Sequence, residues 1–322
     1  MKRLLNLVLF ELKKILNNKK AILFLVVLNV VPIVSSIALL IAYFCCRGFG
    51  FGSFQFAVMK NIVQGLFTGH FTIFGYTAPF FLALIIGDSF STEFGKGYMK
   101  MLLVTPISRW QVITAKSIAV MSYLLVAVVF GGLILQCDLL AARGITQPGF
   151  LPAEMAKNIT LSPELTTQME NQAISLLPED IQKHVNADSI AMISPSSAFE
   201  LLLITFVANL MLIGFLIVFS MFYESAILMS FCSLAAIMAI HVFYWCSGLL
   251  DKLVSWFATI AKFCFTQHYT QLFSPKLIEE ILDGKLSLMS QSVYEPLGYS
   301  ALWTIGFFAL AVIIFSRKQI LH

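Results

Sequence analysis

The side chains that could carry out chemistry in this sequence are few. His241 lies a few residues before Cys246 and Ser247, so these three are the candidates for a base and a nucleophile. No HExxH or GxSxG motif accompanies them, so the familiar zinc and serine hydrolase sites are missing. A lone histidine or asparagine in an apolar helix more often hydrogen-bonds to a neighbouring helix. We therefore interpret His241 and Asn209 first as packing residues, and second as candidates for lining a substrate pathway.

Neither a nucleotide site nor a metal site is expected on this chain. A P-loop has the pattern GxxxxGK followed by Ser or Thr. At the fragment Gly95-Lys96, Phe90 occupies the position where the first glycine of the motif is required. No CxxC pair or Cys/His zinc spacing occurs among the cysteines, which are Cys45, Cys46, Cys137, Cys232, Cys246 and Cys264. The sequence thus predicts no bound metal and no bound cofactor.

The composition is that of an integral membrane protein. Of the 322 residues, 59% are hydrophobic and only 12% are charged, and the mean hydropathy is +0.87. A soluble domain is about half apolar and about one quarter charged, so this chain has too little polar surface to cover a water-soluble particle. The net charge of +4 is small, and no basic stripe with interleaved aromatic residues points to nucleic acid.

Six apolar stretches are long enough to cross a bilayer, which needs about 20 residues of helix. The sequence therefore predicts an all-α integral membrane fold in one transmembrane domain, 1–322. The expected spans are 21–44, 71–87, 112–136, 198–222, 226–246 and 297–315.

Lysine and arginine set the expected orientation. They concentrate in the segment before the first span, the 88–111 loop and the C-terminal end, whereas most acidic residues fall in the remaining segments. Because positively charged loops stay in the cytoplasm, both termini are predicted to be cytoplasmic.

Three segments outside the spans also have recognisable patterns. Residues 2–17 form a basic amphipathic helix, which is predicted to lie in the inner membrane interface. Residues 138–197 are a polar extracytoplasmic insertion with proline-led helix starts, so a small helical cap is expected. Residues 251–296 begin with an apolar stretch too short to span, which favours a re-entrant or interfacial helical hairpin before the last span.

The loop between the second and third spans is the most informative segment. A charged stretch around Asp88 and Glu93 is followed by a short apolar amphipathic helix predicted around 98–104, which Pro106 ends. Ser108 then caps the helix that becomes the third span. Such a short helix across the cytoplasmic surface can carry force between a soluble partner and the membrane.

At these residues the sequence resembles the permease subunits of type 2 ABC transporters, the ABC-2 family of exporters. The family pattern is a Glu, a Gly four residues later, two Leu, Pro-x-Ser-Arg, and a Lys that opens the third span. The matching residues are Glu93, Gly97, Leu102, Leu103, Pro106, Ser108, Arg109 and Lys116, while Tyr98 stands where the family usually has Thr. The six-span layout, the N-terminal helix and the outer hairpin extend the resemblance over the chain, but the 60-residue connection between spans three and four is longer than usual.

The resemblance implies a multi-pass permease of a bacterial plasma membrane. Its matching residues would form the coupling helix and its flanks, on which a separate ABC ATP-binding subunit docks. That subunit would hold ATP and Mg. A second permease subunit, from a homodimer or a heterodimer, would complete the pathway, and membrane lipid would surround it. The substrate class implied is amphipathic or lipid-like, such as a peptide antibiotic, a drug or a glycolipid, moved outward. The alternatives are a non-transporting membrane sensor or anchor with the permease fold and, less favoured, a membrane-embedded enzyme.

Overall fold

A computed structural model gives the fold of this chain. It describes residues 2–46, 53–95, 108–146, 195–250 and 263–317, and every regular element within these ranges is helical. The helices are α1 (Lys2–Leu16), α2 (Lys19–Cys46), α3 (Ser53–Ile86), the π-helical turn η1 (Gly87–Ser91), α4 (Thr92–Gly95), α6 (Arg109–Thr146), α10 (Pro195–Ser220), α11 (Ala226–Leu250), α13 (Phe265–Leu272), α14 (Pro275–Leu282) and α15 (Gln291–Arg317).

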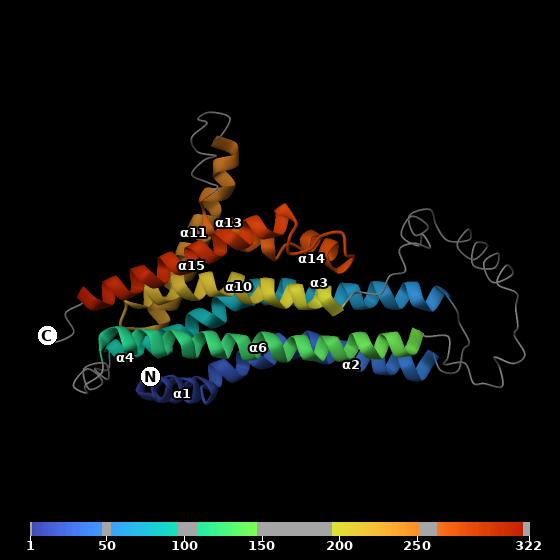
Figure 1. Cartoon of the computed structure of the whole chain (residues 1–322), viewed down its shortest axis with the longest axis horizontal. Coiled ribbons are helices and arrows are strands. Elements are labelled where there is room, and N and C mark those ends of the chain that lie inside the picture. The colour runs from blue at the N-terminus through green and yellow to red at the C-terminus, as the bar shows by residue number, and fades with distance from the viewer. Residues whose placement is uncertain (1, 47–52, 96–107, 147–194, 251–262, 318–322) are drawn as a thin grey trace, which may run out of the picture.

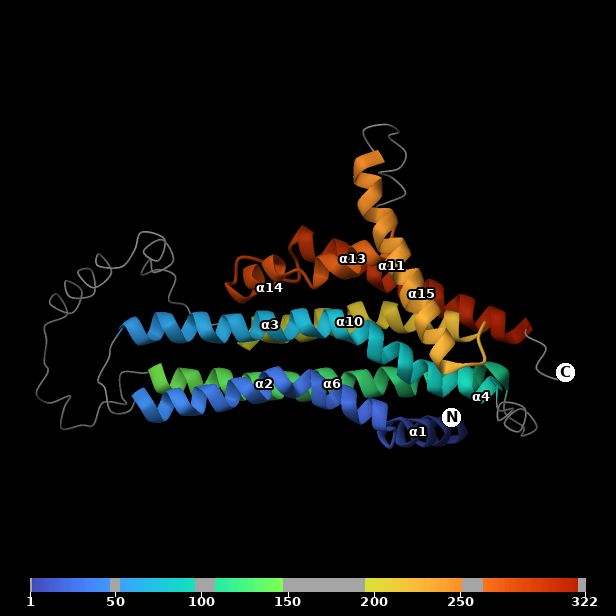
Figure 2. The same cartoon turned by 180° about the vertical axis from the view of Figure 1, so that it is seen from behind.

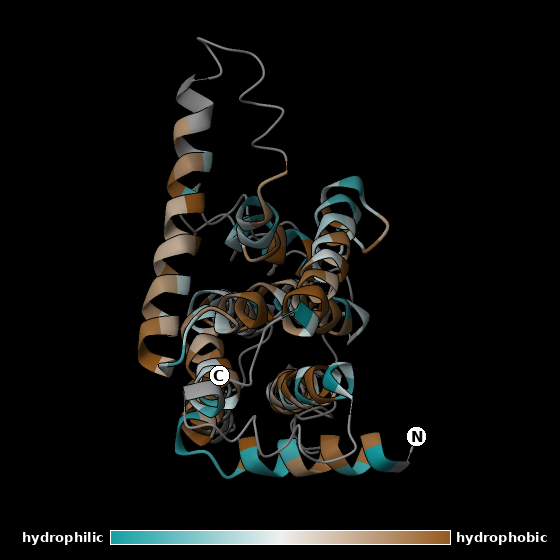
Figure 3. Ribbon diagram, turned by 90° about the vertical axis from the view of Figure 1, so that its left-hand side faces the viewer, coloured by the Kyte–Doolittle hydropathy of each residue, from teal (hydrophilic) through white to brown (hydrophobic). Residues whose placement is uncertain are grey.

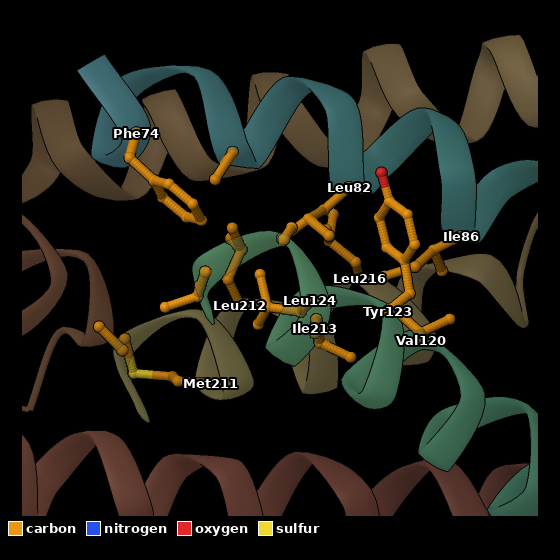
Figure 4. Packing of buried hydrophobic residues seen from close by; sticks show 14 of the residues in the cluster. Phe74, Leu82, Ile86, Val120, Tyr123, Leu124, Met211, Leu212, Ile213 and Leu216 are labelled. Carbon is orange, nitrogen blue, oxygen red and sulfur yellow. The ribbon is translucent and has the colours of Figure 1, made fainter. Parts of the chain in front are cut away.

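The long helices form a layered bundle around α10. Figure 1 shows α2 and α6 in one layer, α3 and α10 in the next, and α13, α14 and α15 in a third, and α10 packs on α15, α6 and α3. The core between α3, α6 and α10 is built from large apolar side chains such as Phe74, Leu82, Tyr123 and Leu212 (Figure 4). The Tyr123 hydroxyl is satisfied there, because it donates a hydrogen bond of 2.6 Å to the Ala21 carbonyl of α2.

Five described helices are long and apolar enough to cross a membrane. They correspond to the second through sixth predicted spans, and the first predicted span falls within α2. A multi-pass helical membrane protein is therefore confirmed, while the full six-span topology stays a prediction. The start of α1 and the end of α15 lie at the same end of the bundle (Figure 1), as an even number of crossings requires.

The two helices on the outside of the bundle expose most of their apolar surface. Only 22% of the apolar window of α11 and 17% of that of α15 are buried within the chain, against 72% for α10. Figures 2 and 3 show α11 leaning away from the other helices, with predominantly hydrophobic residues along its length. Surface this apolar needs lipid or another protein chain around it.

Two short helices precede α15. Ser274 caps α14, since its side chain accepts a hydrogen bond from the Leu277 backbone N–H. The α13 helix is held against α3 at Gly75, where a β-carbon would overlap the Phe273 ring, so only glycine allows this approach. The hydroxyl of Tyr269 also lies 2.9 Å from the Gly75 carbonyl. Two short helices thus occupy 265–282 within the segment 251–296, and the re-entrant or interfacial hairpin expected there stays a prediction.

Helix boundaries differ from the predictions mainly in length. The α6 helix continues to Thr146, past the predicted end of the third span at 136 and into the predicted insertion 138–197. Residues 147–194 of that insertion lie outside the described residues, and its last residues, 195–197, begin α10. The apolar stretch 251–262 and the predicted coupling helix around 98–104 also lie outside the described residues.

Candidate functional site

A charge network that is buried at its centre lies at the end of the bundle where α1, η1, α4 and α6 meet. We use this name for Glu11, Lys14, Lys20, Asp88, Glu93 and Lys116 together. Its centre is Lys116, which lies two turns into α6 and is 1% exposed. A buried ammonium group needs compensating charge and hydrogen-bond acceptors, so the contacts of Lys116 show how this end of the fold is held together.

Lys116 is satisfied by two carboxylates and one carbonyl from three different elements. Its Nζ lies 2.8 Å from Glu11 Oε1 of α1 and 2.7 Å from Glu93 Oε2 of α4. It also donates to the Ser89 carbonyl of η1 at 3.1 Å. The Phe90 ring lies 5.8 Å from the ammonium, within reach of a cation–π contact. One side chain therefore ties α1, η1 and α4 to α6.

Helix α1 has three faces rather than two, which explains why it carries a buried acid. At about 100° per residue, Val8, Glu11 and Ile15 share the face that packs on α6, and all three are buried. Leu5, Leu9 and Leu16 form a separate, exposed apolar face on the next side, and a polar face with Lys13 completes the circumference. Figure 3 shows α1 running crosswise beneath the long helices that are seen end-on.

Lys14 of α1 joins the network at its edge. It forms an ion pair with Glu93, so Glu93 lies between the two cations Lys14 and Lys116. Glu11 has Lys116 as its ion-pair partner, while its second oxygen, Oε2, is buried without a hydrogen-bond partner among the described residues. Glu11 consequently depends on Lys116 more than Glu93 does.

A second set of contacts links the start of α2 to η1. Asn18 caps α2, since its side-chain oxygen accepts a hydrogen bond of 2.9 Å from the Lys20 backbone N–H. Its amide nitrogen donates to Asp88 at 3.1 Å, and the Lys20 ammonium lies 2.8 Å from the same carboxylate. Asp88 therefore holds the short connection between α1 and α2 against η1.

The π-helical turn η1 gives these groups their geometry. A π turn is wider than an α turn and occurs mostly as a single interruption in an α-helix, frequently at functional sites. Here it begins at Gly87, where a β-carbon would come 2.9 Å from the Ala226 carbonyl of α11, so a larger residue would push the two helices apart. The Ser91 hydroxyl donates to the Ser220 carbonyl at the end of α10 at 3.2 Å. The turn is thus anchored on both α10 and α11.

The first turn of α6 confirms the predicted helix start. Ser108 precedes α6, and its backbone N–H donates to the Gln111 side chain at 3.1 Å, which is one half of a capping box. Arg109 reaches from this turn to the Ser316 carbonyl in the last turn of α15, at 3.4 Å. Arg109 therefore lies beside the charge network but contacts a different helix.

The residues predicted from the sequence are only partly brought together. Glu93 and Lys116 meet in the charge network, and Ser108 and Arg109 lie at the adjacent start of α6. Gly97, Leu102, Leu103 and Pro106 fall outside the described residues, so their predicted role stays a prediction. Sequence reasoning missed Glu11 and Lys14, although a glutamate beside the apolar positions of a basic helix was a signal for a buried partner.

Asn209 and His241 lie away from this network and from each other. Asn209 is fully buried in α10, donates to the Thr205 carbonyl at 2.8 Å, and lies 3.2 Å from the Tyr269 hydroxyl of α13. Burial raises the pKa of Tyr269 well above its usual value, so its hydroxyl stays protonated as a donor. His241 is half-buried in α11 near Tyr244. Asn209 thus links α10 to α13, whereas the contact of His241 lies within α11, and the part of both residues in a substrate pathway stays a prediction.

The charge network joins separate helices of the bundle through ion pairs. No group of three or more His, Cys, Asp or Glu side chains in the described part of the chain could hold a metal ion. Buried ion pairs of this kind add little net stability, but breaking one by removing a single partner costs about 3–5 kcal/mol. The elements that the network joins are therefore expected to move together.

Comparison with known proteins identifies the chain. Residues 7–162 match the family model described as an ABC-2 family transporter protein. These residues form an ABC-2 family transporter domain. The matched residues run from the middle of α1 to beyond the end of α6 and include every member of the charge network. No curated protein matches the sequence.

Proposed function

We propose that this permease is the membrane-spanning subunit of an ATP-driven exporter that moves an amphipathic or lipid-like substrate outward. A peptide antibiotic, a drug or a glycolipid has the required chemistry. A separate ABC ATP-binding subunit would bind ATP and Mg, and a second permease subunit, identical or related, would complete the pathway. In this arrangement both chain termini and the charge network face the cytoplasm of a bacterial cell.

The observation that carries this proposal is the position of Lys116 between Glu11 and Glu93. The segment 96–107 leaves from α4, which contains Glu93, and returns into α6, which contains Lys116. A partner that pushes on this segment would therefore displace α4 and α6 together, and would carry α1 with them through Glu11. This is the linkage that a permease needs if ATP hydrolysis on another chain is to move its helices.

The placement of charge within the spans agrees with a lipid-like substrate. Among the described residues, the buried lysine and acidic side chains are Glu11, Glu93 and Lys116, and all three belong to the network at one end of the bundle. Coupling to protons or ions usually requires acidic or basic groups within the membrane. An apolar route driven from the cytoplasmic end fits the distribution better.

The test uses the permease purified with the ATP-binding subunit that accompanies it and reconstituted in vesicles. Glu93→Lys places a cation between Lys14 and Lys116, and Arg109→Glu removes the contact from α6 to the end of α15. Both variants are expected to insert normally and to hydrolyse ATP, but to lose at least tenfold in movement of a fluorescent lipid per ATP hydrolysed. Glu279→Lys, an exposed change on α14, is the matched control and should leave this ratio unchanged.

Two results would contradict the proposal. Normal coupled transport by both Glu93→Lys and Arg109→Glu would remove the coupling role of this end of the fold. Failure of any ATP-binding subunit to accompany the intact chain through purification would favour the sensor or anchor instead.

A further inference from the structure

A second site lies at the end of α15 that is remote from the charge network. A pocket of about 390 Å³ is lined by residues of α13, α14 and the first turns of α15, three elements whose arrangement is seen in Figure 1. Pockets of about 300–1,000 Å³ are typical of small-molecule sites. This one differs from the usual apolar ligand pocket because most of its lining side chains are polar.

The polar groups of the pocket are amides and hydroxyls. Three glutamines and two serines line it, together with the single carboxylate of Glu295. The side-chain oxygen of Gln267 is buried without a hydrogen-bond partner among the described residues, so it is available to a ligand donor. Amide groups both donate and accept, as hydroxyl groups do. No lysine or arginine occurs in the described lining, which disfavours phosphate and other anions.

One wall of the pocket is a preformed aromatic stack. The rings of His268 and Tyr299 lie parallel, with centroids 4.4 Å apart and an interplanar angle of 9°. The Phe263 ring meets Tyr299 edge-on at 6.3 Å. Because His268 covers one face of Tyr299, a cation could approach only the other face of this ring. The stack therefore gives the pocket a fixed shape, while the polar side chains give it selectivity.

The depth of the pocket corresponds to the far head-group layer of a bilayer. Along α15, Tyr299 and Gln291 lie about 27 and 39 Å from Arg317 at a rise of 1.5 Å per residue. Arg317 ends the span beside the start of α6. A hydrocarbon core is about 30 Å thick, and about 40–45 Å with both head-group layers. A helix that begins in one head-group layer would therefore bring the pocket to the other.

We propose that this pocket binds the uncharged, hydroxyl-rich head group of a glycolipid in the leaflet opposite the charge network. The amide groups of Gln267 and Gln271 bond to sugar hydroxyls, and the lipid tail stays in the membrane beside the outer half of α15. Within the proposed exporter, which this reading of the pocket refines, the glycolipid would be the substrate held at its point of release.

The test measures lipid binding directly and needs neither ATP nor a partner subunit. The full chain is placed in nanodiscs containing equal amounts of diglucosyldiacylglycerol, phosphatidylglycerol and a trimethylammonium lipid with the same acyl chains. Lipids retained by the released protein are then counted by native mass spectrometry. We expect the glycolipid to be enriched about tenfold over the other two. Gln267→Leu and Gln271→Leu should each lower this enrichment by about three- to tenfold, the equivalent of one lost hydrogen bond.

Matched variants separate the competing explanations. Gln136→Leu, a change of the same type on α6 outside the pocket, should keep the enrichment, and Gln271 is exposed, so its substitution should not impair folding. Glu295→Gln should also keep it, because a sugar does not require the carboxylate charge. The proposal would be overturned if all three lipids were retained equally, or if Gln267→Leu and Gln271→Leu both kept the full enrichment of the glycolipid. It would also be overturned if the protein preferred the cationic lipid and lost this preference in Glu295→Gln.

The source of the sugar is tested in the same experiment. Free maltose offers the same hydroxyl chemistry without a lipid tail and should not displace the glycolipid. Displacement by maltose would assign the pocket to a soluble sugar and overturn the lipid assignment. Because no transport is measured, loss of the exporter function in the coupling test would leave this result standing, and the reverse also holds.

Discussion

Replacing Lys116 by methionine should release the joint between α1 and the rest of the bundle. Methionine keeps most of the apolar stem but removes the ammonium that lies 2.8 Å from Glu11 and 2.7 Å from Glu93. Glu93 would keep Lys14 as a partner, whereas Glu11 would be left as a buried charge without compensation. Removing one partner of a buried ion pair costs about 3–5 kcal/mol, so we expect a loss of about that size.

A double-mutant cycle separates the charge effect from the loss of packing. Most of the cost of Lys116→Met comes from the unpaired carboxylate, so Glu11→Gln added to Lys116→Met should restore about 2–3 kcal/mol. Glu11→Gln alone leaves Lys116 with Glu93 and should cost less than Lys116→Met. The assay is equilibrium unfolding of the full chain in mixed micelles with increasing SDS, followed by tryptophan fluorescence.

Two outcomes would refute this reasoning. The first is a free energy of unfolding for Lys116→Met that differs by less than about 0.5 kcal/mol from that of the unmodified chain. A change this small is ordinary for surface substitutions and would show that the network does not hold α1 to the bundle. Equal instability of the single variant and the Lys116→Met/Glu11→Gln pair would show that lost packing, not unpaired charge, governs the effect.

Three further predictions address other parts of the chain. Gly75→Ala should destabilise the protein by about 1–3 kcal/mol in the same unfolding assay, because its methyl group overlaps the Phe273 ring, and Phe273→Leu should relieve part of this loss; additive effects would contradict the contact. A reporter fused after residue 170 should be extracytoplasmic and one after His322 cytoplasmic, as measured by enzymatic activity of the fusions, and a cytoplasmic result at 170 would break the six-span topology. Hydrogen exchange across 163–177 should be slow if the insertion forms a docked cap, whereas exchange at the rate of a free chain would exclude one.

The spans and the helical class were predictable because they depend on long apolar runs. Length and hydropathy alone locate α10 and α11 closely, since the polar turn between them interrupts an otherwise apolar stretch. The same signal underestimates α6, which continues to Thr146 through residues that are no longer strongly apolar but still favour a helix. Apolarity marks where a helix crosses the membrane, and it says little about where the helix ends.

The charge network was predictable only in its parts. Glu93 and Lys116 stood out through the resemblance to ABC-2 permeases, but their contact depends on η1, and no sequence signal announces a π turn. Treating the apolar residues of α1 as one lipid-facing side concealed Glu11, because a helix that packs on protein and lies in lipid needs two apolar faces. Side-chain pairing across distant segments comes from packing, which a single sequence does not encode in any local pattern.

The helices of the bundle differ in length, and the longer ones extend past the others at the end away from the charge network. At 1.5 Å per residue, the 34 residues of α3 and the 38 of α6 measure about 51 and 57 Å, against about 40 Å for α15. Since α6 and α15 meet at Arg109 and Ser316, the surplus of about 17 Å stands at the other end, where α3 and α6 form a stalk beyond the hairpin (Figure 2). If α15 crosses the bilayer once, α3 and α6 therefore extend about three helical turns past it on that side.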